Sequence, residues 1–324
     1  MELTVVDDEQ VRALTPWPLL IDEICKAFRR GGESPARSQH SIPGDDREDI
    51  ILLQMPAWDE AGNFGVKLAT VAPSNAALGF PTLHGVYILF SGENGIPLAI
   101  FDAGALTARR TAAASALASR YLSREDSKTL LVIGTGRVAR QLVAAHCAVR
   151  PIEEVRIWGR NKMHAQDAAE SASQATGVKC VCVPDAETGA AGADIISAAT
   201  SAEAPLLQAG WVGPGTHIDL VGAFKPTMCE ADAELIGKAD QVFIDTIEGA
   251  KDEAGDLLQA VQAGTFSFDD IAGDMYRMSS ADTSLRNGPG EITLFKSVGA
   301  ALQDLAAAQL CIQQLQKTPD SLEK

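Results

Sequence analysis

The sequence lacks the features that would direct it to nucleic acid or into a membrane. Its 324 residues carry 27 Lys and Arg against 43 Asp and Glu, and the formal net charge is -16. Nucleic acid and anionic membranes both attract basic surfaces, so neither is an expected partner. No apolar run approaches the length of a bilayer-spanning helix, and the opening residues MELTVVDD lack the basic and apolar regions of a signal peptide. We therefore expect a cytoplasmic protein.

Cysteine and histidine are few and follow no metal-binding pattern. The six cysteines form no C-x-x-C pair, and the five histidines form no H-E-x-x-H motif, so no metal site is predicted. Cys180 and Cys182 alternate in an apparent strand and are expected to point to one buried face. We interpret all six cysteines as reduced packing residues.

The length indicates two domains. A helix is expected over 19–29, and short β-rich runs separated by turn residues follow it. These runs predict a largely antiparallel sheet, with strands at 50–55, 65–71, 85–90 and 98–101. An alanine-rich helix over 106–122 leads to the second domain. We predict one domain from 1–122 plus 297–324 and another from 123–296.

Strands alternate with helical segments in the second domain, and such alternation predicts a parallel, doubly wound sheet. The expected strands are 130–133, 155–158, 178–183, 194–198, 217–221 and 241–245. A final helix is expected over 294–316, and the tail from Thr318 is expected to fray. The predicted fold class is α/β: a Rossmann-type parallel sheet inserted into an α+β domain.

The segment 129–139 reads TLLVIGTGRVA, an apolar strand that ends in a G-x-G-x-x-A turn before a helix pattern. In a dinucleotide-binding βαβ unit the first glycine permits the tight turn, and the second lets the backbone approach the pyrophosphate. A plain structural connection is the alternative. The residues expected at the cofactor are Gly134, Thr135, Gly136, Arg137 and Val138, together with Thr200 and Phe224 at two further strand ends.

Arg160 stands at the end of the second strand of this unit, where an NAD-specific site usually has Asp or Glu. Arginine accommodates a ribose 2′-phosphate, so the sequence favours NADPH, with NADH possible. A solvated loop charge is the alternative interpretation.

Several cations lie in apolar surroundings. Arg109 and Arg110 occur within an alanine-rich helix, Lys67 lies in an apolar strand, and Arg37 precedes the first strand run. A buried guanidinium needs an anion, either an acidic side chain or a substrate carboxylate. His84 is a candidate proton donor, although a structural histidine is the favoured interpretation of this residue.

The chain resembles the ornithine cyclodeaminase and mu-crystallin family. The resemblance covers nearly the whole chain and is carried by LTARRTAAASALA at 106–118, the GTG turn, VGAFKP at 221–226, DTIEGA at 245–250, EAGD at 253–256 and EITLFKSVG at 291–299. It implies a homodimer with a substrate-binding and dimerisation domain built from both chain ends. It also implies that Arg37, Lys67 and Arg110 hold a substrate carboxylate, with Thr111 beside the nicotinamide.

Two departures bear on the reaction that the resemblance implies. Ornithine cyclodeaminases have an Asp where this chain has Phe224, and a Glu where it has Leu53. The segments HGVYILF at 84–90, VRIWGR at 155–160 and AGD at 272–274 are instead similar to bacterial delta-1-pyrroline-2-carboxylate reductases. The resemblance thus implies NAD(P)H-dependent reduction of a small cyclic imino acid. An ammonia-releasing cyclodeaminase and a non-catalytic, mu-crystallin-like NADPH-binding protein are the alternatives.

Overall fold

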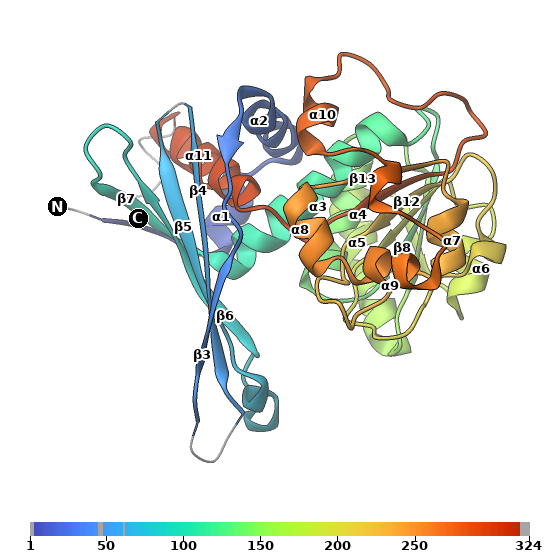
Figure 1. Cartoon of the computed structure of the whole chain (residues 1–324), viewed down its shortest axis with the longest axis horizontal. Coiled ribbons are helices and arrows are strands. Elements are labelled where there is room, and N and C mark those ends of the chain that lie inside the picture. Colours follow the sequence, from blue (N-terminus) through green and yellow to red (C-terminus); the bar gives the residue numbers. More distant parts are fainter. Residues whose placement is uncertain (1–2, 45–47, 61, 318–324) are drawn as a thin grey trace. The chain divides into compact units, whose positions relative to one another are not determined.

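The computed structural model describes residues 3–44, 48–60 and 62–317, which form two compact units (Figure 1). One unit joins Met1–Arg110 to Ala300–Lys324, and the other comprises Thr111–Gly299. Both ends of the chain therefore belong to the same unit. The units divide inside α3 (Ala103–Leu122), whereas the sequence placed the boundary after this helix. The expected fraying from Thr318 lies outside the described residues.

The first unit contains a seven-stranded sheet with the order β1-β7-β6-β5-β4-β2, and β3 also pairs with β4. All neighbours are antiparallel except β1 and β7, so the predicted antiparallel sheet is confirmed. The three additional strands are short or polar, which explains why periodicity missed them. The strands are β1 (Thr4–Val6), β2 (Gly32–Glu33), β3 (Ser38–Ile42), β4 (Ile50–Asp59), β5 (Phe64–Val71), β6 (Leu83–Phe90) and β7 (Pro97–Asp102).

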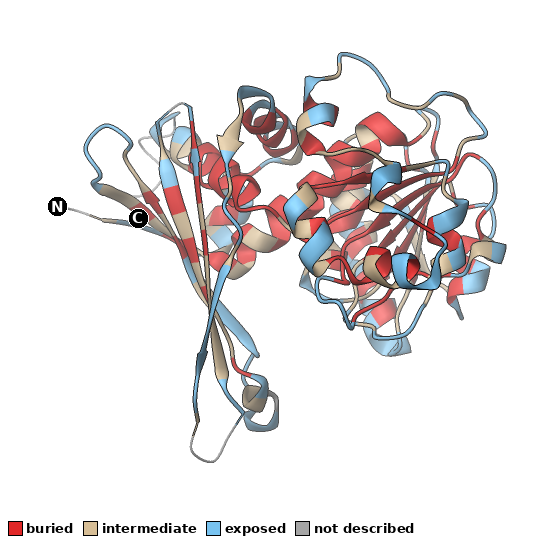
Figure 2. Cartoon of the chain, in the orientation of Figure 1, coloured by how far each residue is buried: buried red, intermediate tan, exposed pale blue. Residues whose placement is uncertain are grey.

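One face of this sheet is covered by α11 (Ala301–Lys317), which contacts β4, β5 and β6 and also packs on α2 (Trp17–Arg30). Most of α11 is buried, as Figure 2 shows. Because side chains alternate along a strand, Gly65, Lys67 and Ala69 of β5 share the buried face. The first helix, α1 (Asp8–Leu14), begins at a capping box formed by Asp7 and Gln10.

The second unit contains an eight-stranded sheet with the order β10-β9-β8-β11-β12-β15-β13-β14, and all its neighbours are parallel. The predicted doubly wound fold is confirmed. Since all the strands run the same way, their carboxyl ends meet at one edge. The strands are β8 (Thr129–Ile133), β9 (Glu154–Trp158), β10 (Lys179–Cys182), β11 (Ile195–Ala198), β12 (His217–Leu220), β13 (Gln241–Ile244), β14 (Ile271–Gly273) and β15 (Thr293–Lys296).

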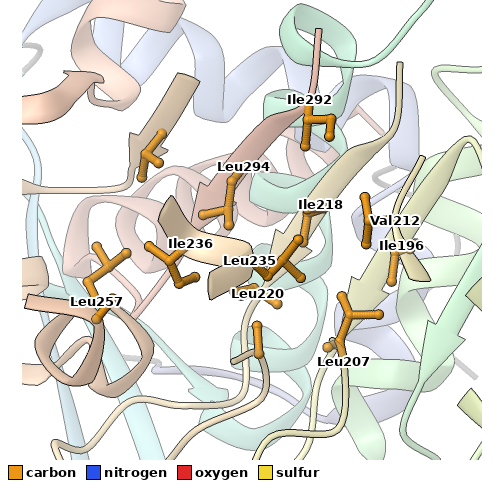
Figure 3. Close-up of a cluster of buried hydrophobic side chains, with 14 of the residues drawn as sticks. Ile196, Leu207, Val212, Ile218, Leu220, Leu235, Ile236, Leu257, Ile292 and Leu294 are labelled. Carbon is orange, nitrogen blue, oxygen red and sulfur yellow. The ribbon is translucent and has the colours of Figure 1, made fainter. Parts of the chain in front are cut away.

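A hydrophobic cluster fills the space between one face of this sheet and its helices (Figure 3). Each large aliphatic side chain that becomes fully buried contributes about 1.5–3 kcal/mol. Strand residues in the cluster include Ile196, Ile218 and Leu220, and Leu235 and Leu257 join it from helices. The helices of this unit are α4 (Arg137–Cys147), α5 (Lys162–Thr176), α6 (Ala186–Ala190), α7 (Ala233–Lys238), α8 (Ile247–Glu253), α9 (Gly255–Ala263) and α10 (Met275–Ser280).

The prediction of a helix over 294–316 is wrong for its first residues. Residues Thr293–Lys296 form β15, which lies between β12 and β13, and α11 begins only at Ala301. The run TLFK is fully buried, and periodicity cannot separate so short an apolar segment from a helix.

The six cysteines are all free, as expected. Cys180 and Cys182 do alternate on a strand, but both are only half-buried. The prediction that they point to a buried face of the sheet is therefore wrong. The reason is that β10 is an edge strand of the eight-stranded sheet.

Candidate cofactor and anion sites

The turn after β8 requires a glycine at its first position. Gly134 has φ +125, and a Cβ on it would lie 2.5 Å from the carbonyl oxygen of Ala199. Its N–H donates to the carbonyl of Trp158 at 2.8 Å, which fixes the turn against the end of β9. Ala139, the small residue that ends the motif, is buried. The chain therefore leaves β8 in a conformation that other residues rarely adopt.

Gly136 is the N-cap of α4 and supplies no side-chain hydrogen bond to the helix. A Cβ added to it would meet nothing within 4 Å, so the backbone here borders open space. The N-terminus of α4, beginning at Arg137 and Val138, carries the positive end of the helix dipole. This geometry fits the pyrophosphate of a dinucleotide.

The end of β9 lies beside this turn. Ile133 pairs with Trp158, and a Cβ on Gly159 would lie 2.6 Å from the Thr135 methyl group. Arg160 follows directly and is exposed. It is therefore next to the turn that fits the pyrophosphate.

The remaining expected cofactor residues follow two other strands at the same edge of the sheet. Thr200 comes after β11 and is half-buried, and Phe224 comes after β12 with 42% of its surface exposed. The two loops are joined by the buried carboxylate of Glu230, which accepts hydrogen bonds from the N–H groups of Thr200 and Gly222, each at 2.6 Å.

In the first unit, two of the predicted cations meet at one carboxylate. Lys67 Nζ lies 2.8 Å from Asp304 Oδ2, and Arg110 Nε lies 3.1 Å from Asp304 Oδ1. Arg110 also donates to Gln303 Oε1 at 2.6 Å, and Lys67 donates to the Thr107 hydroxyl at 3.4 Å. All of Asp304 is buried, and the two cations are nearly so. Two positive side chains therefore share a single negative one.

The charges of this cluster shift its pKa values. Burial lowers the pKa of Lys67 to about 8, and the charges of Arg110 and Arg37 add to this effect while Asp304 opposes it. For Asp304, burial acts to raise the pKa, but Arg110 and Lys67 outweigh it and hold the pKa below its ordinary value. An additional anion at the cluster would stabilise the charged form of Lys67.

Two further residues that the sequence predicted at the substrate site are Arg37 and His84. Arg37 is half-buried between β2 and β3, and its charge reaches Lys67. His84 pairs with Thr70, whereas Lys67 pairs with Tyr87. Since consecutive residues of a strand point to opposite faces, His84 lies on the face of the sheet away from Lys67. The structure thus does not bring His84 to the cations, so its predicted proton-transfer role gains no support from the fold.

Arg109 has a structural environment of its own. It donates from Nε to the Thr15 hydroxyl at 3.1 Å and from its terminal nitrogen to the Thr15 carbonyl, and its guanidinium stacks 3.5 Å from the ring centre of Trp17. Its neighbour Thr111 is buried in α3 immediately after Arg110.

Sequence reasoning missed the acidic partners of both regions, Asp304 and Glu230. Each is a carboxylate among apolar residues in the sequence, and this pattern could have identified both as candidate buried acids. Over the described parts of the chain, no group of three or more His, Cys, Asp or Glu residues could hold a metal ion. No helix among residues 3–44, 48–60 and 62–317 is long and apolar enough to cross a membrane.

The fold and these sites define a Rossmann-type dinucleotide-binding protein whose other unit carries two buried cations that share one carboxylate. The profile of the ornithine cyclodeaminase/mu-crystallin family matches residues 1–318, and the chain belongs to this family.

Similar proteins include reductases of the substrate class that the sequence indicated. A delta(1)-pyrroline-2-carboxylate reductase of Paracoccus denitrificans is 37% identical over 282 residues, which cover 84% of this chain and 88% of that one. The structure of the Thermococcus litoralis delta(1)-pyrroline-2-carboxylate reductase in complex with NADH and L-proline has a TM-score of 0.90 at 29% identity, with 98% of each chain covered. An archaeal alanine dehydrogenase dimer with bound NAD has a TM-score of 0.87 at 29% identity, again covering 98% of each chain.

Proposed function

We propose that this protein is an NAD(P)H-dependent reductase of cyclic ketimines. It reduces delta-1-pyrroline-2-carboxylate to L-proline and also accepts the six-membered homologue, which gives L-pipecolate. The observation that carries this proposal is the sharing of one buried carboxylate, Asp304, by Lys67 and Arg110. The excess positive charge attracts a substrate carboxylate, and the reductases of Paracoccus and Thermococcus support the choice of substrate.

The roles of the side chains follow from their charges. Lys67 and Arg110 bind the carboxylate of the imino acid, and Arg37 adds to the positive potential. Fixing the carboxylate fixes the neighbouring imine carbon, C2, and this orientation is the main contribution that these residues make to catalysis. When bound, the dinucleotide supplies the hydride that C2 accepts. The imine nitrogen must also gain a proton, because the product is a secondary amine.

Two residues argue against the cyclodeaminase alternative. Deamination of ornithine requires groups that accept and return protons of a free amine, and neither Phe224 nor Leu53 can do so. Leu53 pairs with Ala69 of β5 and lies on the same face of the sheet as Lys67. The second alternative, a non-catalytic NADPH-binding protein, does not account for a buried pair of cations with one shared carboxylate.

A turnover assay tests the proposal. Purified protein is mixed with NADPH and each cyclic imine, and the absorbance of the reduced nicotinamide is followed while the product is identified by chiral chromatography. We expect oxidation of NADPH with formation of L-proline and L-pipecolate. A parallel incubation with ornithine and NAD is expected to release no ammonia. Ammonia release without imine reduction would identify a cyclodeaminase instead, and inertness in both assays would favour the non-catalytic alternative.

We infer a preference for NADPH from Arg160. It is exposed beside the turn that fits the pyrophosphate, where a ribose 2′-phosphate can receive charge-assisted hydrogen bonds. Such bonds contribute about 1.5–3 kcal/mol each, or roughly a tenfold to hundredfold change in affinity. Arg160→Asp is therefore expected to weaken NADPH by at least about tenfold and to leave NADH unchanged, as measured by titration calorimetry. Equal effects on both dinucleotides would refute the preference.

We propose that the protein is a homodimer formed through the face of the first sheet opposite α11. On this face Val66, Ile88 and Ile100 lie in one row, and all three are only half-buried. Val5 extends the row and is 68% exposed. A continuous apolar face across several strands favours burial against a second copy. The archaeal alanine dehydrogenase is a dimer, which supports the dimeric state but not the choice of face.

Light scattering coupled to size-exclusion chromatography tests the dimer. The wild type is expected to have twice the chain mass, and Ile88→Glu is expected to shift it toward the monomer because a charge would be buried at the interface. Gln166→Glu, which adds the same single negative charge at an exposed position of α5, serves as the control for net charge effects. A monomeric wild type would contradict the proposal.

A further inference from the structure

The loops that follow β11 and β12 are tied together by one buried carboxylate. Glu230 Oε1 accepts the Thr200 N–H at 2.6 Å and the Thr200 hydroxyl at 3.0 Å, and Oε2 accepts the Gly222 N–H at 2.6 Å. Glu230 has no exposed surface. Both oxygens are therefore used as acceptors, which is the arrangement that an ionised carboxylate satisfies.

The two loops approach so closely that no side chain fits at Gly222. A Cβ on Gly222 would lie 2.0 Å from the Thr200 carbonyl oxygen and 2.4 Å from Glu230 Oε1. Phe224 is two residues beyond Gly222, so the position of its loop depends on the same carboxylate. β11 is the neighbour of β8, and the turn after β8 fits the pyrophosphate. The tied loops thus lie at the carboxyl ends of the strands, where doubly wound sheets bind ligands.

We propose that ionised Glu230 is a positioning residue, which sets the loops of Thr200 and Phe224 for the nicotinamide half of the bound dinucleotide. The proposal rests on the proposed function for the identity of the ligand. It assigns Glu230 no contact with the substrate or with the dinucleotide. Its effect is transmitted through the backbone N–H groups of Thr200 and Gly222.

The charges around Glu230 make this positioning sensitive to pH. Asp256 accepts the N–H of Glu230 at 2.6 Å, and Lys296 Nζ lies 2.9 Å from the other oxygen of Asp256. The thiol of Cys229, the preceding residue, donates to the Ala231 carbonyl at 2.9 Å. Burial raises the pKa of Glu230 to about 7, Asp256 adds to the rise, and Lys296 and the two backbone N–H groups oppose it.

Protonation of Glu230 changes the number of acceptors that it offers. The proton occupies one oxygen, so one of the bonds to the loops is weakened or lost. A neutral hydrogen bond contributes about 0.5–1.5 kcal/mol, which corresponds to a change of roughly two- to twelvefold in an equilibrium constant. We therefore expect the nicotinamide half to be bound less tightly as the pH falls through about 7.

A comparison of two ligands isolates this half of the dinucleotide. The affinities of NADPH and of 2′-phospho-ADP-ribose, which lacks the nicotinamide, are measured from pH 6 to pH 8.5, and their ratio is taken so that titration of the 2′-phosphate cancels. In the wild type, the affinity for NADPH divided by that for 2′-phospho-ADP-ribose is expected to fall about two- to twelvefold between high and low pH. Glu230→Gln is expected to give the low ratio at every pH, because its amide nitrogen cannot accept. Glu234→Gln, an exposed change in α7, is the matched control.

A second pair of variants tests the proposal if Glu230→Gln does not fold. Thr200→Val removes the hydroxyl that donates to ionised Glu230, so the midpoint of the pH dependence is expected to move to higher pH. Thr200→Ser retains the hydroxyl and should retain the midpoint. An unchanged midpoint in Thr200→Val would overturn the proposal. So would a Glu230→Gln variant with the wild-type ratio, or one that weakens both ligands equally, since equal weakening indicates a purely structural role.

These binding measurements need no imine. If NADPH binds but no cyclic imine is reduced, the proposed function fails while the ratio still decides the role of Glu230. If imines are reduced and the ratio is independent of pH and of Glu230, only the positioning role fails.

Discussion

Replacing Asp304 by asparagine is expected to destabilise the first unit strongly. The substitution keeps the shape of the side chain but removes the charge that Lys67 and Arg110 share at 2.8 and 3.1 Å. One carboxylate oxygen becomes an NH₂ group, which cannot accept from either cation. Removing one partner of a buried ion pair costs about 3–5 kcal/mol, because it leaves an uncompensated buried charge.

This loss corresponds to a lowering of Tm by roughly 6–20 °C, at about 2–4 °C per kcal/mol. Differential scanning calorimetry and denaturant titration measure it. The control is Asp8→Asn, which breaks the surface pair between Asp8 and Arg12 and should change stability by less than about 1 kcal/mol. Excess L-proline is expected to stabilise Asp304→Asn more than the wild type, since its carboxylate supplies the missing anion.

The double variant Lys67→Met/Asp304→Asn separates coupling from simple addition. Removing Lys67 also removes one of the uncompensated charges, so the double variant should be more stable than the sum of the single losses predicts, by at least about 1 kcal/mol. Additive losses, or an Asp304→Asn variant within about 1 kcal/mol of the wild type, would refute the reasoning.

Further predictions concern the turn and the pH dependence. Gly134→Ala should abolish dinucleotide binding in calorimetry without unfolding the first unit, because its φ of +125 is strained for alanine and the added Cβ would lie 2.5 Å from the Ala199 carbonyl oxygen; retained affinity would contradict this. The value of kcat/KM should fall as the pH rises through about 8, since Lys67 then loses the proton that attracts the carboxylate. Lys67→Arg should move this decline to higher pH, and an unmoved decline would assign it to another group.

The local geometry of the dinucleotide turn was predictable from sequence. A buried strand that ends in Gly134-x-Gly136 has few conformations available, and the requirement at Gly134 is set by its immediate neighbours. The parallel sheet followed from the alternation of strands and helices. The position of β15 did not follow, because the pairing of Thr293–Lys296 with β12 and β13 depends on contacts between distant segments.

The anion site was only partly predictable for the same reason. The apolar surroundings of Lys67 and Arg110 indicated that each needs an anion, but Asp304 is 194 residues from Arg110 in the sequence. A carboxylate inside the apolar helix ALQDLAAAQL was the overlooked signal. The face on which His84 lies depends on strand register, which is fixed by hairpin geometry and not by the residue itself.

The central claim is that Arg110 and Lys67 hold the carboxylate of a cyclic imino acid for reduction. Its most direct test is the kcat/KM for delta-1-pyrroline-2-carboxylate in Arg110→Met, with the Kd for NADPH measured on the same sample. Arg109→Met, the neighbouring residue that contacts Thr15 and Trp17, is the matched control. We predict a loss of at least about a hundredfold in Arg110→Met, from charge-assisted hydrogen bonds of about 1.5–3 kcal/mol each, with an unchanged Kd. An Arg110→Met variant with wild-type kcat/KM would contradict the claim.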